Sequence, residues 1–126
     1  DADAQAEAYR RQHLQQQGEA RYHLVMARYH LAQEHIQAAE KEIWSISELP
    51  EAQQTEYLLL RGRIALRKEQ FENALLYLQQ AEQTGGASRY LLRELYASME
   101  QCCREREDFK GAYEYATRQR ELSEPK

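Results

Sequence analysis

Residues that interrupt helices are scarce in this chain. Only two prolines and five glycines occur among its 126 residues, so few positions force a turn and long helices are expected. Gln, Glu, Ala, Leu and Arg dominate the composition, and all five favour helix. No stretch alternates apolar and polar residues for long enough to indicate a strand. The sequence therefore predicts an all-α fold.

Cysteine is also rare, with Cys102 and Cys103 as the only two. Neighbouring residues on a helix point about 100° apart, which is poor geometry for a bond between them. A disulfide framework is excluded. We expect two small residues at a helix interface, while a reactive or metal-binding pair is the alternative. Reducing surroundings are compatible with this cysteine usage.

Excess positive charge and long apolar runs are both missing. The net charge is −4 and the pI is near 5.6, so the chain lacks the basic footprint of a nucleic-acid-binding protein and a lysine-rich face for a membrane. No apolar run reaches membrane-spanning length and no signal peptide is present. A cytoplasmic location is expected, or a periplasmic one if a longer parent chain carries a signal. Because the sequence starts "DADAQAEA" without Met, we expect an excerpt or a processed form.

Three stretches of the chain share one pattern. They read "QEHIQAAEKEIWSI" at 33–46, "KEQFENALLYLQQA" at 68–81 and "REDFKGAYEYATRQ" at 106–119. Each has a large apolar residue followed by alanine three positions later: Ile36 and Ala39, Phe71 and Ala74, Phe109 and Ala112. The spacings of 35 and 38 residues are typical of a stacked repeat, in which each hairpin buries its apolar face against the next.

Punctuation residues divide the chain into helix-length segments. Breaks are expected at Gly18, Pro50 and Gly85-Gly86. The predicted helices are 2–17, 19–33, 35–48, 52–68, 70–84, 88–106 and 108–122. The segment 1–18 then forms a separate N-terminal helix, with a partial apolar stripe at Tyr9, His13 and Leu14. Two interpretations stay open for it: a capping helix, or the second helix of a preceding repeat.

The middle copy of the repeat, counted from Thr55, carries the most specific pattern. Its apolar and small residues are Leu58, Gly62, Ala65, Phe71, Ala74, Leu78 and Ala81. On these residues the chain resembles the tetratricopeptide repeat family. The resemblance implies a right-handed α-solenoid with three repeats over residues 19–126. The third copy departs from the family pattern: Glu100 stands where a small residue is usual, Gln119 replaces a late alanine, and about four residues are added.

In this family the first helix of each repeat lines a concave groove that takes a peptide or a partner helix. The corresponding positions here include Glu94, Ala97, Ser98, Gln101 and Arg104 in the third copy. From the first two copies the resemblance implies partner-binding residues at Leu24, Arg28, Leu59, Leu60, Arg63 and Arg67. Interleaved leucines and arginines favour a ligand with apolar anchors and acidic groups. Alternatively, the N-terminal helix or a second copy of the chain fills the groove.

Family members that bind chaperone tails use lysine and asparagine at fixed places in this groove. Leu24, Arg28 and Leu60 occupy three of those places. A chaperone-tail receptor is therefore not expected.

Motifs for catalysis or cofactor binding do not occur. No nucleophile motif, phosphate-binding glycine loop or metal-ligand spacing is present, so neither enzymatic activity nor a cofactor is expected. His23 and His30 lie seven residues apart, about 10.5 Å along a helix, and cannot share one zinc ion. We expect both to be half-buried at a hairpin interface. "TGGAS" at 84–88 is predicted to be a turn, with an anion site at the following helix as the alternative.

The predicted function is a non-catalytic protein–protein interaction module. The segment "YEYATRQRELSEPK" at 113–126 is similar to the exit helix of repeat domains that precede bacterial signalling output domains, such as diguanylate cyclases or sensor kinases. This similarity implies a sensory or regulatory part of a larger signalling protein. The alternative is a structural self-association module that forms a homodimer through Trp44 or the N-terminal helix.

Overall fold

A computed structural model describes residues 2–124, without the side chains of residues 13, 16 and 17. Over this range every regular element is a helix, which confirms the all-α prediction. The chain divides into two compact units, residues 1–54 and 55–126. Each unit is described by itself below.

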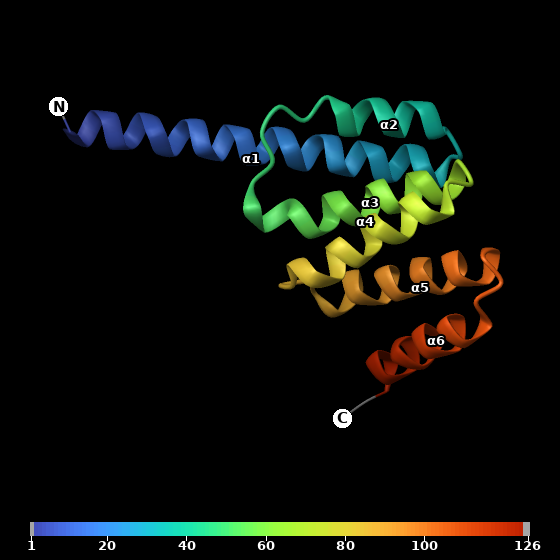
Figure 1. The fold of residues 1–126 in the computed structure, drawn as a ribbon. Coiled ribbons are helices and arrows are strands. Elements are labelled where there is room, and N and C mark those ends of the chain that lie inside the picture. Colours follow the sequence, from blue (N-terminus) through green and yellow to red (C-terminus); the bar gives the residue numbers. More distant parts are fainter. Residues whose placement is uncertain (1, 125–126) are drawn as a thin grey trace. The chain divides into compact units, whose positions relative to one another are not determined.

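The first unit is a hairpin of two helices, α1 (Ala2–Ala32) and α2 (Ile36–Trp44), followed by a short 3-10 turn at Glu51–Gln53 (Figure 1). The buried positions on α1 recur at helical spacing, and they are Ala20, Leu24, Ala27 and Leu31. On α2, Ala39 and Ile43 are buried. A hydrogen bond of 2.7 Å between His23 Nδ1 and Glu42 Oε2 links the two helices.

The predicted break at Gly18 is wrong, because α1 runs through it without interruption. A single glycine costs a helix about 1 kcal/mol relative to alanine, which weakens the helix without ending it. The predicted stripe of the N-terminal segment is not a packing face: Tyr9 is 71% exposed and Leu14 66% exposed. The third stripe residue, His13, lies outside the described side chains.

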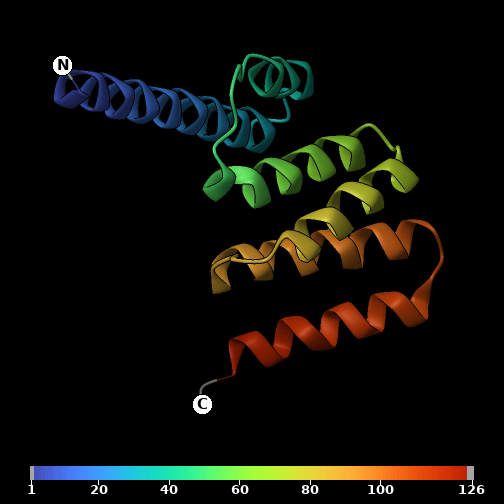
Figure 2. The ribbon, with the colours of Figure 1, turned by 60° about the vertical axis from the view of Figure 1, so that its left-hand side comes forward.

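The second unit contains four helices: α3 (Gln54–Arg67), α4 (Phe71–Thr84), α5 (Arg89–Glu105) and α6 (Phe109–Ser123) (Figures 1 and 2). Two of them begin at side-chain caps, since Ser88 Oγ accepts from Leu91 N at 3.2 Å and Asp108 Oδ1 accepts from Gly111 N at 3.0 Å. These acceptors satisfy amide groups that the first turn leaves without partners.

The connection between α4 and α5 is the turn expected at "TGGAS". Gly85 and Gly86 both have positive φ, at 75° and 69°, a conformation that glycine adopts without steric cost. The carbonyl of Gly85 accepts a hydrogen bond of 3.0 Å from Thr55 Oγ1. This bond ties the turn to the start of α3.

A second kind of turn occurs three times, once inside each helical hairpin. Glu34, Glu69 and Glu107 have φ of 61°, 60° and 60°. In each case the next amide donates to a carbonyl five residues back: His35 N to His30 O at 2.8 Å, Gln70 N to Ala65 O at 2.9 Å, and Asp108 N to Cys103 O at 2.8 Å. This is the Schellman pattern that ends helices. The three turns are 35 and 38 residues apart, so the sequence repeat is also a repeat of backbone conformation.

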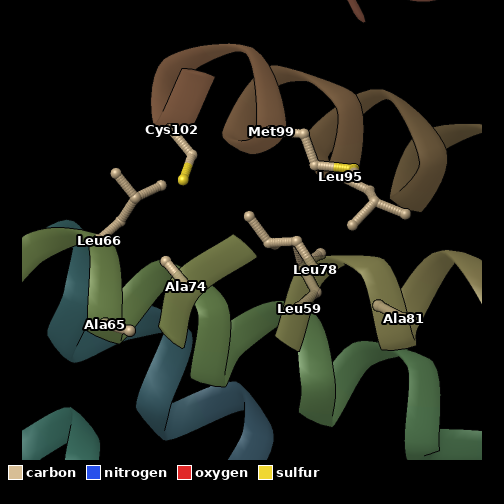
Figure 3. Packing of buried hydrophobic residues seen from close by; sticks show 9 residues of the cluster. All are labelled: Leu59, Ala65, Leu66, Ala74, Leu78, Ala81, Leu95, Met99 and Cys102. Carbon is tan, nitrogen blue, oxygen red and sulfur yellow. The ribbon is translucent and has the colours of Figure 1, made fainter. Parts of the chain in front are cut away.

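The core of the second unit lies between α5 and the α3–α4 hairpin (Figure 3). It consists of Leu59, Ala65, Leu66, Ala74, Leu78, Ala81, Leu95, Met99 and Cys102. Gly62 permits close contact of α3 with α4, because a Cβ added there would lie 2.7 Å from Leu78 Cγ. Ala39, Ala74 and Ala112 are all buried, in agreement with the small-residue positions of the repeat pattern.

The last hairpin solves the same packing problem with different residues. With the repeat shift of 38, Glu100 takes the place of Gly62, and Ala116 takes the place of Leu78. A larger residue on α5 is therefore matched by a smaller one on α6, and both line one surface pocket. Glu100 accepts a hydrogen bond of 2.6 Å from Gln119 Nε2 and one of 2.7 Å from Arg104 Nη2. The two departures from the family pattern at Glu100 and Gln119 are thus one polar contact between α5 and α6.

Both cysteines are buried and neither forms a disulfide, which confirms the interpretation as small residues at a helix interface. The thiol of Cys102 donates to the carbonyl of Phe71 at 3.1 Å. Burial is the main cause that raises the pKa of both thiols above the usual value. Protonated, weakly nucleophilic thiols are the expected result.

Candidate functional site

A surface pocket of about 230 Å³ lies between α3 and α5 in the second unit. Its lining comes from α3 and α5 alone. The residues are Arg63, Leu66, Arg67, Glu94, Ala97, Ser98 and Gln101. We call this pocket the α3–α5 groove.

The helix geometry of α3 puts two arginines on one wall of the groove. Arg63 and Arg67 are four residues apart, so their side chains lie on neighbouring turns of one face. Arg63 is half-buried and Arg67 exposed. Leu59 and Leu66 hold that wall in place, because both belong to the core beneath it.

The α5 wall is mostly polar and carries the opposite charge. Glu94 is half-buried, and Ala97 and Gln101 are exposed. Ser98 is buried, and its hydroxyl donates to the carbonyl of Glu94 at 2.9 Å. The groove therefore offers guanidinium donors on one side and carboxylate and amide groups on the other. Such a surface suits a ligand that carries both charge and hydrogen-bonding groups.

The structure places the predicted partner-binding residues in two different environments. Arg63 and Arg67 line the α3–α5 groove. Leu24, Leu59 and Leu60 are 0–1% exposed, so the prediction that these leucines lie on an open face is wrong. The buried residues of α3 itself include Leu59, Leu60 and Ile64. Burying a leucine side chain stabilises the fold by roughly 1.5–3 kcal/mol. The fold has buried the leucines and left the arginines as the accessible part of the predicted set.

The sixth predicted residue, Arg28, lies on α1 in the first unit and is half-buried. Arg28 takes the same place in the first repeat of the sequence as Arg63 in the second, and the expectation that stacking brings the two near each other stays a prediction. The α5 wall was available from the sequence through the repeat shift of 38, which relates Glu56 to Glu94 and Leu60 to Ser98. Arg104, also a groove position by that shift, pairs with Glu100 at 2.7 Å and is not part of the lining.

A second cluster joins α4, α5 and α6. The rings of Tyr96 and Tyr115 stack with centroids 6.1 Å apart. The guanidinium of Arg118 lies 5.7 Å and 5.1 Å from these two centroids, and it forms an ion pair of 3.2 Å with Glu82. Burial, as the main cause, raises the pKa of Tyr115. The stacked rings and the ion pair hold three helices together, so we assign this cluster a structural role.

The two histidines singled out by the sequence are half-buried, as predicted. His23 contacts Glu42 of α2, and the ring of His30 lies 6.3 Å from that of His35, which precedes α2. Among the side chains that the structure describes within residues 2–124, which do not include that of His13, no three from His, Cys, Asp or Glu are grouped so that they could hold a metal ion. In the same part of the chain, no helix combines the length and apolar character needed to cross a membrane.

Comparison of the chain with models of protein families, with curated proteins and with solved structures finds no match. A function must therefore be inferred from the α3–α5 groove and the chemistry of its lining residues.

Proposed function

We propose that the chain is a non-catalytic interaction module of the tetratricopeptide type, with repeats stacked as a right-handed solenoid. In this role it holds a peptide or a partner helix in the α3–α5 groove. One observation carries the proposal. The groove is lined by seven residues of α3 and α5, and by the resemblance all seven, Leu66 included, are positions that line the binding groove of the family.

The chemistry of the two walls defines the partner. Arg63 and Arg67 favour a carboxylate, which guanidinium groups bind with paired hydrogen bonds. Gln101 on the other wall can donate to a backbone carbonyl and accept from an amide. Because the predicted leucines are buried, apolar contact is limited to the edges of Leu66 and Ala97. We therefore expect an acidic partner segment held mainly by polar contacts, with modest affinity.

A module of this kind acts by bringing other proteins together. The similarity of residues 113–126 to exit helices of repeat domains favours a place in a larger bacterial signalling protein. In that setting, occupation of the α3–α5 groove would regulate the output domain.

A peptide-display selection against the purified chain tests the groove directly. We expect selected peptides to be rich in Asp and Glu, and to bind less tightly as salt increases. The double variant Arg63→Glu and Arg67→Glu should lose at least tenfold in affinity for the same synthetic peptides. A matched control reverses two exposed arginines outside the groove, Arg93 and Arg106.

Circular dichroism should show that both double variants remain folded. Equal binding of the acidic peptides by the groove variant and the wild-type chain would contradict the proposed site. Selection of peptides without acidic residues would contradict the proposed ligand chemistry.

A further inference from the structure

One face of α6 carries aromatic residues that the fold leaves exposed. Phe109, Tyr113, Ala116 and Arg120 follow each other at spacings of four, three and four residues, so they share one side of the helix. Phe109 is 66% exposed and Tyr113 is 68% exposed. We call these four residues the outer strip. None of them lines the α3–α5 groove.

The preceding hairpin shows what the same face does when it is covered. The repeat shift of 38 relates Phe109, Tyr113 and Ala116 to Phe71, Leu75 and Leu78 of α4. Leu78 is part of the core, and Phe71 and Leu75 pack against it. Leu95, Met99 and Cys102 of α5 lie over this core (Figure 3). This face of a second repeat helix is thus one on which another helix packs.

A helix placed on the last hairpin as α5 is on α3 and α4 would meet polar or small residues where the preceding hairpin offers apolar ones. Ala97, Arg104 and Gln119 stand where the preceding hairpin has Leu59, Leu66 and Ala81. The Arg104 side chain is 65% exposed, and it pairs with Glu100. Covering that ion pair would remove charges from water at a cost that the contact often does not recover. A partner should therefore leave the exposed Arg104 in water and contact the outer strip and the surface beside Ala116, an area about one helix wide.

The outer strip has the right order of residues to pair with a second copy of itself that runs in the opposite direction. In chain order it reads aromatic, aromatic, small, cationic; in reverse it reads cationic, small, aromatic, aromatic. An antiparallel second copy places each Tyr113 ring opposite the partner's Ala116, and each Arg120 opposite the partner's Phe109. A two-fold interface needs this kind of pairing, because each residue contacts its counterpart in both directions.

The surface beside the small residue has room for a ring. A pocket of about 460 Å³ opens there, and its lining residues are Glu100, Ala116, Gln119, Arg120, Ser123 and Glu124. A tyrosine that enters it keeps its hydroxyl near polar groups, as buried tyrosines usually do. An arginine over a phenylalanine ring adds a cation–π contact.

We propose that the chain forms a two-fold dimer in which the outer strip of α6 packs antiparallel on that of a second copy. This interaction is separate from ligand binding in the α3–α5 groove. A contact between single helices falls at the small end of protein interfaces, below about 1,200 Å² of total buried area. The dimer is therefore weak, and it forms in the micromolar range or above.

Sedimentation equilibrium of the 126-residue chain, from about 5 to about 500 μM, tests the dimer in the range expected for a small interface. We expect the average mass to rise toward twice the chain mass. Tyr113→Glu should weaken association at least tenfold, because it places a carboxylate in the contact. Tyr90→Glu is the matched control, since Tyr90 is 65% exposed on α5 and lies outside the outer strip.

The antiparallel register has its own test. In an equimolar mixture of the single variants Tyr113→Cys and Ala116→Cys, mild oxidation should join the two into a covalent mixed dimer, whereas either variant alone, or a mixture of Tyr90→Cys and Arg93→Cys, should not crosslink. This experiment also decides the matter if Tyr113→Glu proves to be unfolded. A chain that stays monomeric at every concentration would overturn the proposal. So would a dimer that Tyr113→Glu does not weaken, which would indicate another surface, such as that around Trp44.

Discussion

At the scale of single residues, the three hairpin turns have a shared and costly feature. Glutamate occupies the left-handed conformation at Glu34, Glu69 and Glu107, where a side chain is sterically disfavoured by about 1–2 kcal/mol. Glycine is the usual residue at this position of a Schellman turn. The repeat has kept the backbone geometry without the residue that favours it most.

Replacing one of these glutamates should therefore stabilise the protein. We expect Glu69→Gly to raise the free energy of unfolding by about 0.5–1 kcal/mol, because the gain at positive φ exceeds the entropic cost of glycine. Urea unfolding followed by circular dichroism measures the change. In the control variant Gln79→Gly, at an exposed position inside α4, glycine should instead cost about 1 kcal/mol. Destabilisation by both changes would argue against strain at Glu69.

Replacing glycine by alanine should change the stability in opposite directions at two helical positions of this chain. A Cβ at Gly62 would lie 2.7 Å from Leu78 Cγ, whereas one at Gly18 would have nothing within 4 Å. Gly62→Ala should therefore destabilise by about 1–3 kcal/mol through overpacking. Gly18→Ala should stabilise by up to about 1 kcal/mol through helix propensity. Thermal and urea unfolding of the two variants give both signs in one experiment, and equal signs would refute the close contact.

The buried thiols should make the free energy of unfolding depend on pH in the alkaline range. Because burial raises the folded-state pKa of Cys102 above an unfolded value of about 8.5, the folded state binds its proton more tightly. The resulting stability is complete below about pH 8.5 and is lost as pH rises through the folded-state pKa. Between pH 7.5 and 10, the free energy of unfolding should fall less steeply for Cys102→Ala than for the wild-type chain. Parallel curves would show that this thiol does not contribute.

At the scale of elements, the helical hairpin is the repeated unit, and its tightness is set by alanine. Ala74 is fully buried in the core between α4 and its neighbours. The neighbouring hairpin has Ala112 at the equivalent place, 5% exposed. A small side chain at this position allows the helix backbones to approach, since cores are packed to nearly crystalline density.

Enlarging that residue should disturb the hairpin. Ala74→Leu is expected to lower the free energy of unfolding by about 1–3 kcal/mol, because the added methylenes have no space. Asn73→Leu, one position earlier and exposed on α4, serves as a control that should change stability by less than about 0.5 kcal/mol. The comparison is made by thermal unfolding, and an unchanged melting temperature for Ala74→Leu would remove the packing argument.

At the scale of the molecule, the two proposed partner surfaces of the second unit are separate. The α3–α5 groove uses Arg63 and Arg67, while the outer strip uses residues of α6 alone. Interactions at sites without shared contacts usually contribute independently. Peptide binding in the groove and dimerisation through α6 are therefore compatible in one assembly.

This independence can be measured. The groove variant Arg63→Glu and Arg67→Glu should dimerise with the wild-type constant within about twofold, as expected for sites that do not couple. Tyr113→Glu should bind acidic peptides as the wild-type chain does. Sedimentation and peptide titration on the same two variants give all four values. A change of tenfold or more in the untouched activity would show that the two surfaces are coupled.

The sequence by itself determined the helical class and the positions of the hairpin turns. Scarce glycine and proline, together with helix-forming residues, leave no other regular structure available. The recurring Phe or Ile and Ala marked the turns near residues 34, 69 and 107, because hydrophobic and small residues must recur wherever a hairpin packs on its neighbour. The burial of Ala39, Ala74 and Ala112 follows from the same requirement.

Only the tertiary structure decided which side of each helix is covered. On α3 apolar residues occur on several faces, so spacing could not tell that Leu59 and Leu60 are buried while Arg63 remains at the groove. Nor could composition tell that α1 continues through Gly18, since helix continuity depends on the balance of the flanking residues. The departure at Glu100 was visible in the sequence, but its hydrogen bond with Gln119 of α6 was shown only by the tertiary structure. The burial of a residue depends on which other elements pack against its helix, and the sequence of that helix does not specify those elements.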